Sequence, residues 1–233
     1  GLLIGGSVAF MFSAQAIRAV SRAAGRVVFE VRKQFREHPG IMDYSERPDY
    51  GAVVDICTRD SLRELLTPGL LAVLAPIATG FLFESAALGA YLAGAILTGQ
   101  LLAVMLSVSG GAWDNAKKYV EDGHHGGKNS ESHKATVIGD TVGDPVKDTA
   151  GPALNPLIKV MNLVAVLIAP TVVALADDEL LRALIVVVAV ALLAWALWRS
   201  NRMGGVTLAT PAAEEAPVPV EPDPHPTTQR TSS

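Results

Sequence analysis

Residues 67–107 read TPGLLAVLAPIATGFLFESAALGAYLAGAILTGQLLAVMLS, an apolar run with a single charged side chain, that of Glu84. A helix needs about 20 mostly apolar residues to cross a bilayer core of roughly 30 Å. This run is long enough for two such helices. We therefore predict two transmembrane helices, Thr67–Phe83 and Ala86–Ser107, joined by a short link at Glu84 and Ser85.

Three more apolar segments lie on either side of this run, at residues 1–17, 149–175 and 180–198. The first is short and has no basic leader, so we expect the chain to begin inside a transmembrane helix and to be a fragment. Half of the residues are hydrophobic, and the mean hydropathy is +0.34. The sequence thus predicts an all-α fold, a polytopic transmembrane helical bundle with five spans, and disfavours a soluble protein. A single cysteine, Cys57, excludes an internal disulfide.

Charged residues are concentrated in alternate links between the spans. The long loops 18–66 and 112–148 are rich in Arg and Lys, whereas the links at 84–85 and 177–179 contain neither. By the positive-inside rule, the two long loops and the C-terminus are cytoplasmic. The tail, residues 203–233, is rich in Pro, Ser, Thr and Glu, and we expect it to be disordered in the cytoplasm.

An acid and two lysines share one helix face in the motif GGAWDNAKK, residues 110–118. Lys117 and Lys118 follow Asp114 at spacings that make them neighbours on a helix surface. At the edge of a membrane this group suits a metal–phosphate complex, with the carboxylate on Mg²⁺ and the ammonium groups on phosphate oxygens. An ordinary surface ion pair explains the same spacing, and this motif alone leaves both interpretations open.

Three aspartates follow at regular spacing in the motif GDTVGDPVKDT. Asp140, Asp144 and Asp148 are each four residues apart, so an α-helix would place them along one face with about 40° of drift between neighbours. Like charges at this spacing destabilise a bare helix, and Lys147 alone does not neutralise three of them. Magnesium fits best, because it takes oxygen ligands and binds one or two carboxylates together with substrate phosphates.

The next span carries two polar groups into the apolar region. We expect Pro145 in the first turn of this helix, where its missing N–H costs nothing. Asn155 and Lys159 then lie at hydrocarbon depth. A buried lysine in a span is expensive and should face the bundle interior beside an acid, which we expect on a helix outside this chain. A lysine that snorkels to the interface is the alternative.

The two motifs closely resemble those of the membrane-bound, proton- or sodium-translocating inorganic pyrophosphatases. The similarity continues through Gly151–Asn155 and Ile158–Lys159, with further matches upstream at VFEVR (28–32) and PGIM (39–42). It covers residues 1–175, and two long ungapped motifs make it specific. The chain resembles the C-terminal portion of a bacterial member of this family.

This resemblance implies a homodimer with roughly sixteen or seventeen spans per subunit in the plasma membrane. The activity implied is hydrolysis of magnesium pyrophosphate coupled to the pumping of H⁺ or Na⁺ out of the cytoplasm. The implied partners are pyrophosphate, the pumped ion and the lipid bilayer, with no nucleic acid. The implied cofactor is Mg²⁺, several ions per site, and K⁺ is a further candidate whose requirement the sequence leaves open.

The resemblance also implies a role for each motif residue. Three carboxylates would hold Mg²⁺: Asp114, Asp140 and Asp144. Three lysines would contact the diphosphate: Lys117, Lys118 and Lys147. Asp148 would position and deprotonate the attacking water, and Asn155 and Lys159 would line the ion pathway, with Lys159 in a gate. The family's other acidic helices lie outside this chain, which alone is expected to be inactive.

Three other functions were considered. A P-type ATPase fragment has a loosely similar hinge motif, but this chain lacks the DKTGT phosphorylation sequence and a large soluble domain. A secondary ion carrier needs carboxylates near mid-membrane, whereas these three are expected at the cytoplasmic mouth. A membrane scaffold gives no reason for three acids at helical spacing.

Overall fold

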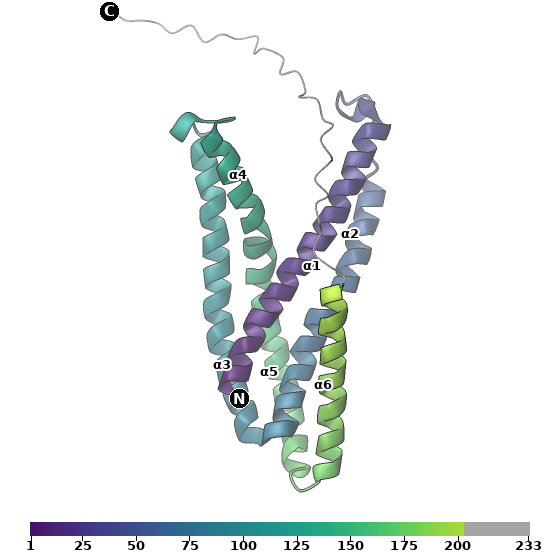
Figure 1. Cartoon of the computed structure of the whole chain (residues 1–233), viewed down its shortest axis with the longest axis vertical. Helices are drawn as coiled ribbons and strands as arrows, with labels where there is room; N and C mark the ends of the chain where they lie inside the picture. The colour runs from purple at the N-terminus through teal and green to yellow at the C-terminus, as the bar shows by residue number, and fades with distance from the viewer. Residues whose placement is uncertain (203–233) are drawn as a thin grey trace, which may run out of the picture.

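The computed structural model of the protein describes residues 1–202 and shows a helical chain (Figure 1). Its α-helices are α1 (Leu2–Glu37), α2 (Tyr50–Glu64), α3 (Leu66–Glu121), α4 (Glu131–Asp144), α5 (Gly151–Ala174) and α6 (Glu179–Arg202). The shorter elements are two 3₁₀ turns, η1 (Pro39–Ile41) and η2 (His124–Gly126), and a π-helical segment, η3 (Pro145–Ala150). No β-strand occurs within residues 1–202, and the predicted all-α fold is confirmed. The tail for which disorder was predicted, 203–233, lies outside the described residues.

Helix α3 contains the predicted link between two spans, because its path reverses at Glu84 (Figure 1). Glu84 has a φ of 68°, in the left-handed region, and this interrupts the helix. The two arms pack together beside the reversal, where a Cβ on Gly80 would lie 3.3 Å from Leu88 Cδ2. Four helical stretches of the described chain are long and apolar enough to cross a membrane, and Tyr50–Glu121, one of them, holds both arms. Five spans were predicted and four stretches are found, because Tyr50–Glu121 contains two of the predicted spans, one on each side of the reversal.

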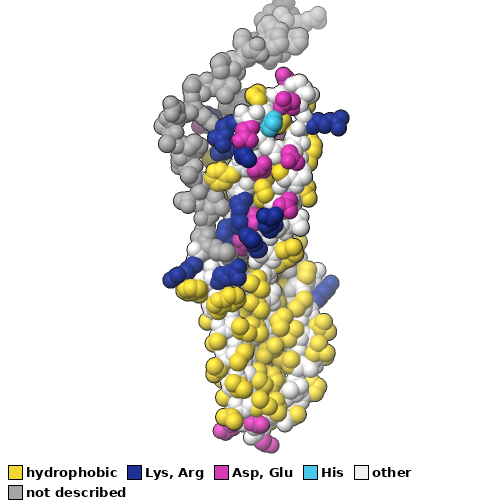
Figure 2. Space-filling view, turned by 90° about the vertical axis from the view of Figure 1, so that its right-hand side faces the viewer, with side chains coloured by type: hydrophobic (Ala, Val, Ile, Leu, Met, Phe, Trp, Pro, Cys, Tyr) yellow, Lys and Arg dark blue, Asp and Glu magenta, His cyan; other side chains and the backbone are white. Residues whose placement is uncertain are grey.

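The surface of the molecule divides into an apolar part and a charged part. In Figure 2, hydrophobic side chains cover the lower half of the visible face, and most Lys, Arg, Asp and Glu side chains gather in the upper half. Exposed side chains such as Leu163, Leu167 and Leu184 belong to the apolar part. Soluble monomers rarely expose contiguous apolar surface of this extent. The chain is therefore part of an integral membrane protein, and its charged end extends beyond the apolar region.

The core lies where α1, α5 and the second arm of α3 meet. Tyr91, Leu154 and Met161 are fully buried there, and Tyr91 Oη donates a hydrogen bond to Met161 Sδ at 3.0 Å. Glycines bring α1 close to α3, because a Cβ on Gly5 or Gly94 would collide with the backbone of the facing helix. Small residues allow such close approach between helices in a membrane. This contact holds α1 beside the arm of α3 that leads to the charged end.

Two ion pairs, one of them buried, tie α2 to α1. Arg22 donates to the carboxylate of Glu64 through Nε at 2.9 Å and NH2 at 2.5 Å, and both side chains are buried. Arg26 NH1 lies 2.9 Å from Asp60 Oδ1. Removing one partner of a buried pair leaves an uncompensated charge, which is strongly destabilising. Helix α2 is therefore fixed against α1 at the charged end.

Helix α6 is fastened to the bundle by polar contacts at its charged end. Ser200 Oγ donates to Gln15 Oε1 at 2.6 Å in a buried contact, and Arg18 NH1 donates to Asn201 Oδ1 at 2.8 Å. Between its ends α6 is almost wholly apolar and contacts α3 through small residues such as Ala189, which is buried. Polar contacts at the ends therefore set the position of a helix whose middle packs without directional bonds.

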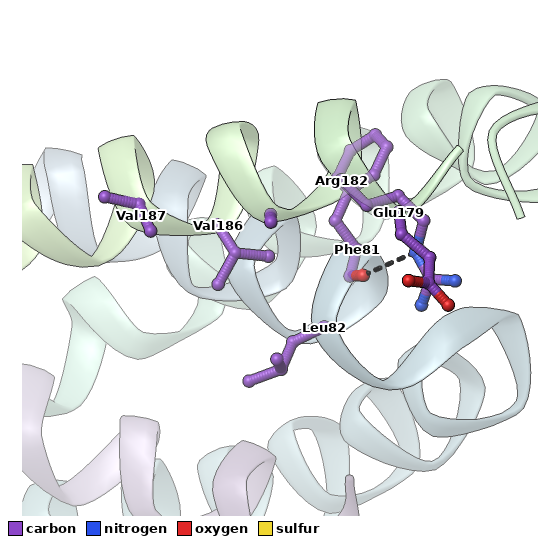
Figure 3. Close-up of a pocket in the computed structure, with 7 residues that line it drawn as sticks. Phe81, Leu82, Glu179, Arg182, Val186 and Val187 are labelled. Atoms are coloured by element: carbon purple, nitrogen blue, oxygen red, sulfur yellow. Dashed lines mark hydrogen bonds between the residues drawn. The ribbon is translucent and has the colours of Figure 1, made fainter. Parts of the chain in front are cut away.

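Arg182 fastens the opposite end of α6 (Figure 3). Its Nε donates to the Phe81 carbonyl oxygen at 3.1 Å, and its NH1 donates to the Ala176 carbonyl oxygen at 2.8 Å. NH1 also lies 3.4 Å from Glu84 Oε1. The last carbonyls of a helix have no partner within the helix, so the guanidinium supplies donors where the first arm of α3 and α5 both end. Arg182 lies within the apolar span predicted at residues 180–198, and these acceptors explain the presence of an arginine there.

We expect Arg182→Ala to lower the free energy of unfolding by roughly 2 kcal/mol, because two carbonyl groups lose a charged donor. The measurement is the thermal unfolding midpoint of the purified protein in detergent. Arg202→Ala is the matched control, since Arg202 is exposed and lies over the Trp198 ring at 4.2 Å. An equal loss of stability in both variants would contradict the fastening role.

Candidate active site

Six charged side chains meet at the charged end, where the second arm of α3 passes α4 and η3. Three come from α3: Asp114, Lys117 and Lys118. The other three come from α4 and η3: Asp140, Asp144 and Lys147. The two sequence motifs thus form one cluster, since each α3 residue contacts a partner in its own motif, in the other motif, or in both.

Lys147 lies at the centre of this cluster. Its Nζ is 3.0 Å from Asp114 Oδ2, 3.2 Å from Asp140 Oδ1 and 2.9 Å from Asp144 Oδ1. Lys117 Nζ donates to the second oxygen of Asp140. These contacts join α3 to α4 and η3, and both sides of the contact contribute carboxylates.

Lys118 occupies the rim of the cluster. Its Nζ lies 3.1 Å from Asp114 Oδ2, and 62% of its side chain is exposed, against 14% for Lys147. An exposed pair of this kind contributes little to stability. Lys118 is therefore free to exchange its carboxylate partner for a ligand at small cost.

Two glycines allow α3 to approach α4 and η3 this closely. A Cβ on Gly110 would lie 2.7 Å from Lys147 Cβ and 2.8 Å from the Gly143 carbonyl oxygen. A Cβ on Gly143 would lie 3.0 Å from a ring carbon of Trp113. Real Cβ atoms essentially never approach within 3.0 Å. The cluster therefore depends on the absence of side chains at these two positions.

The helix that carries the aspartates is continuous from α4 through η3 into α5. Pro145 occupies the first turn of η3, but the helix itself begins at Glu131, where Ser130 Oγ accepts a hydrogen bond from the His133 N–H at 3.1 Å. The prediction that Pro145 begins the helix is therefore wrong. A proline inside a helix lacks an N–H and crowds the carbonyl four residues earlier. The wider π-helical turn accommodates it, as π-bulges inside α-helices do.

Asp148 lies outside the cluster. It is exposed, and no residue within 1–202 forms an ion pair with it. The π-helical winding of η3 begins after Asp144, so Asp148 follows on a wider turn than the α-helical spacing assumes, and the stacking of this third acid stays a prediction. Asn155 and Lys159 are also exposed, on the surface of α5. The functional roles predicted for these three residues remain predictions.

The lysines hold the buried acids in their charged form. Hydrogen bonds from Lys147 and Lys118 lower the pKa of Asp114 to about 2. The hydrogen bond from Lys117 lowers the pKa of Asp140 below its ordinary value, and the bonds to Asp144 and Asp114 raise the pKa of Lys147. The cluster contains three carboxyl and three amino side chains, so its formal charges balance. A neutral cluster can receive a metal cation and an anion together without a large net charge.

A second polar contact closes the α3–α4 hairpin beyond the cluster. His133 Nε2 lies 3.0 Å from Glu121 Oε1, and this hydrogen bond lowers the pKa of Glu121. Tyr119 stacks on His124 with ring centroids 3.8 Å apart. No sequence pattern indicates the Glu121 contact, because its partner lies across a turn of irregular backbone. The hairpin holds the two motif-bearing helices together at their far ends.

The donor set suits a hard divalent cation. Three carboxylates each place an oxygen within 3.2 Å of Lys147 Nζ, and Mg²⁺ takes oxygen ligands of this type, one or two from protein and others from phosphate and water. No group of three Asp, Glu, His or Cys side chains in the described range is gathered as a metal site, since an ammonium lies between these acids. The residues therefore fit Mg²⁺ in their chemistry once the ammonium moves aside.

Residues 1–168 match the family described as "Inorganic H+ pyrophosphatase". The chain belongs to this family. It is 68% identical over 208 residues to the "K(+)-insensitive pyrophosphate-energized proton pump" of Streptomyces avermitilis, which covers 88% of this chain and 26% of that protein. Identity to the protein of the same name from Chloroflexus aurantiacus is 57% over 202 residues, 87% of this chain and 26% of that protein.

A "Putative K(+)-stimulated pyrophosphate-energized sodium pump" of Bacteroides thetaiotaomicron is 52% identical over 174 residues, 75% of this chain and 24% of that protein. The chain spans about a quarter of the length of these relatives. An aligned stretch of 88% of the chain includes α6, so the Streptomyces similarity extends past the family match, which ends at residue 168.

Gly110→Ala should disrupt the cluster, because the added methyl group would force α3 away from Lys147. We expect a loss of roughly 1–3 kcal/mol of stability, the usual range for overpacking, and a lower affinity for any ligand of the cluster. Gly111→Ala is the control, because nothing lies within 4 Å of its Cβ position. Thermal unfolding of both variants is the measurement, and equal midpoints would contradict the requirement for close approach.

Proposed function

We propose that the complete protein hydrolyses inorganic pyrophosphate and couples this reaction to the transport of an ion across the membrane. The observation that carries the proposal is the cluster of three carboxylates and three lysines at the charged end of an apolar helical bundle. Family membership and the names of the relatives support it. The chain contributes part of the site, and the rest belongs to the remainder of the polypeptide.

Each group of the cluster has a distinct task in this proposal. The acids that would hold Mg²⁺ are Asp114, Asp140 and Asp144. The lysines that would neutralise the diphosphate oxygens are Lys117, Lys118 and Lys147. Bound Mg²⁺ would supply charge neutralisation at the bridging and leaving oxygens of the diphosphate. Because phosphoryl transfer depends mainly on positioning and electrostatic stabilisation, fixed cations on two helices provide much of what the reaction requires.

Asp148 is proposed to orient the attacking water and accept its proton. Asp148 is exposed, lies one residue after Lys147, and forms no ion pair within residues 1–202. Lys147 and its three acid partners would hold the substrate on one side, which leaves Asp148 available to a water on the other. A general base must lie within hydrogen-bonding reach of the proton it removes.

A polar stripe on α5 supports the proposed ion pathway. Asn155 and Lys159 are one helical turn apart and exposed, and Lys159 is the charged residue of a helix that is mostly apolar. Lys159 has no ion pair among residues 1–202. Ionisable groups in spans face the bundle interior and mark ion pathways, so we infer that the remainder of the protein covers this stripe and supplies an acid for Lys159.

The transported ion is proposed to be H⁺, and the protein to be insensitive to K⁺, because its more similar relatives carry those descriptions. The charged end would face the cytoplasm, in agreement with the positive-inside rule. The protein would act as a homodimer, as the resemblance to the family implies.

The direct test is phosphate release by the complete protein in membranes with Mg²⁺. We expect release from pyrophosphate and none from ATP, with acidification of inside-out vesicles during the reaction. Omission of K⁺ should leave the rate unchanged. Release from ATP alone would disprove the proposal and favour a P-type ATPase.

Lys159→Ala should separate hydrolysis from transport. Its loss would remove the cation of the gate while leaving the cluster at the charged end intact, so transport per pyrophosphate hydrolysed should fall at least about tenfold, a coupling loss of about 1.4 kcal/mol. The measurement is the ratio of vesicle acidification to phosphate release. Leu163→Ala, one turn further along α5, is the control, and an unchanged ratio for Lys159→Ala would remove the gate from the proposal.

A further inference from the structure

The ammonium group of Lys147 has all of its hydrogen-bonding capacity in use. An ammonium carries three donors and no acceptor. Its three neighbours, Asp114, Asp140 and Asp144, lie at 3.0, 3.2 and 2.9 Å and come from two different helices. The side chain is only 14% exposed. Lys147 therefore cannot donate to a phosphate without first releasing at least one carboxylate.

The oxygens that bind Lys147 are the ones that a divalent cation would use. Magnesium binds oxygens at about 2.0–2.1 Å in near-octahedral geometry. An ammonium and a divalent ion compete for these carboxylates, because like charges a few ångströms apart repel strongly outside bulk water. Occupation by one therefore disfavours the other.

The three lysines of the cluster differ in how many carboxylates they contact. Among residues 1–202, Lys147 contacts all three carboxylates, whereas Lys118 contacts Asp114 alone and is mostly exposed. Lys117 contacts Asp140 and, at 3.7 Å, Asp114. Lys147, on the π-helical turn of η3, is therefore the lysine at the centre of the cluster.

We propose that Lys147 is an internal substitute for the divalent cation, which occupies the carboxylate site until a phosphate anion offers its ammonium another partner. The inference rests on the proposed function and adds an order of binding to it. The metal alone competes with Lys147 and binds weakly, whereas the metal accompanied by diphosphate finds the carboxylates released. The flexible four-carbon stem of a lysine permits this exchange of partners.

The test is binding of Mn²⁺, as a probe for Mg²⁺, to the complete purified protein without phosphate, followed by electron paramagnetic resonance. Lys147→Met keeps the apolar stem and removes the charge. We expect it to bind Mn²⁺ roughly tenfold more tightly than the unmodified protein, within the usual range of coupling between two ligands. Lys147→Gln gives a second variant of similar length in case the methionine variant does not fold, and thermal unfolding checks both.

Lys118→Met is the matched control, since it removes an equal charge beside the same Asp114. We expect it to tighten Mn²⁺ binding by less than about threefold, because an exposed charge is screened by salt and solvent. Unchanged or weaker binding in folded Lys147 variants would overturn the inference, and so would equal tightening in the Lys118 variant. If the unmodified protein fails to hydrolyse pyrophosphate, the proposed function fails while the Mn²⁺ comparison still stands.

Discussion

The close approach of α3 to α4 and η3 is the constraint on which the charged end of the molecule depends. Acids and lysines on separate helices meet at hydrogen-bonding distance only because Gly110 and Gly143 leave no side chains between the backbones. The resulting cluster is charge-balanced, so it tolerates the low dielectric at the edge of the apolar region better than an isolated acid would. The contact of α3 with α4 and η3 thus determines both the helix packing and the electrostatics of the cluster.

The sequence predicted the parts of the fold that depend on composition along the chain. Span length is set by bilayer thickness, so the apolar runs on both sides of Glu84 located two spans and the reversal between them. Asp114 and the two lysines that follow it share a helix face as their spacing required. The resemblance of both motifs to one family indicated that they belong to one site. The two motifs are distant in sequence, and no local pattern shows that they meet.

The errors arose where local winding and tertiary contacts decide the outcome. The π-helical turn that contains Asp148 was not predicted, because its wider winding is not visible in an i, i+4 pattern. The start of the helix at Glu131 depended on the Ser130 cap rather than on Pro145. Arg182 was unexplained because its acceptors, the Phe81 and Ala176 carbonyl groups, belong to other segments. Such partners become visible only in three dimensions.

The uninterrupted path from α4 through η3 into α5 has a mechanical consequence. Lys147 and Lys159 lie on one rod, twelve positions apart, which corresponds to about 18 Å at the rise of an α-helix. No loop separates them, and the π turn and Pro156 are places in this stretch where the winding can change. A rotation of the helix at the charged end would therefore pass along a continuous helix toward the apolar part of the molecule. One continuous helix thus links the charged cluster around Lys147 to the part of α5 that carries Lys159.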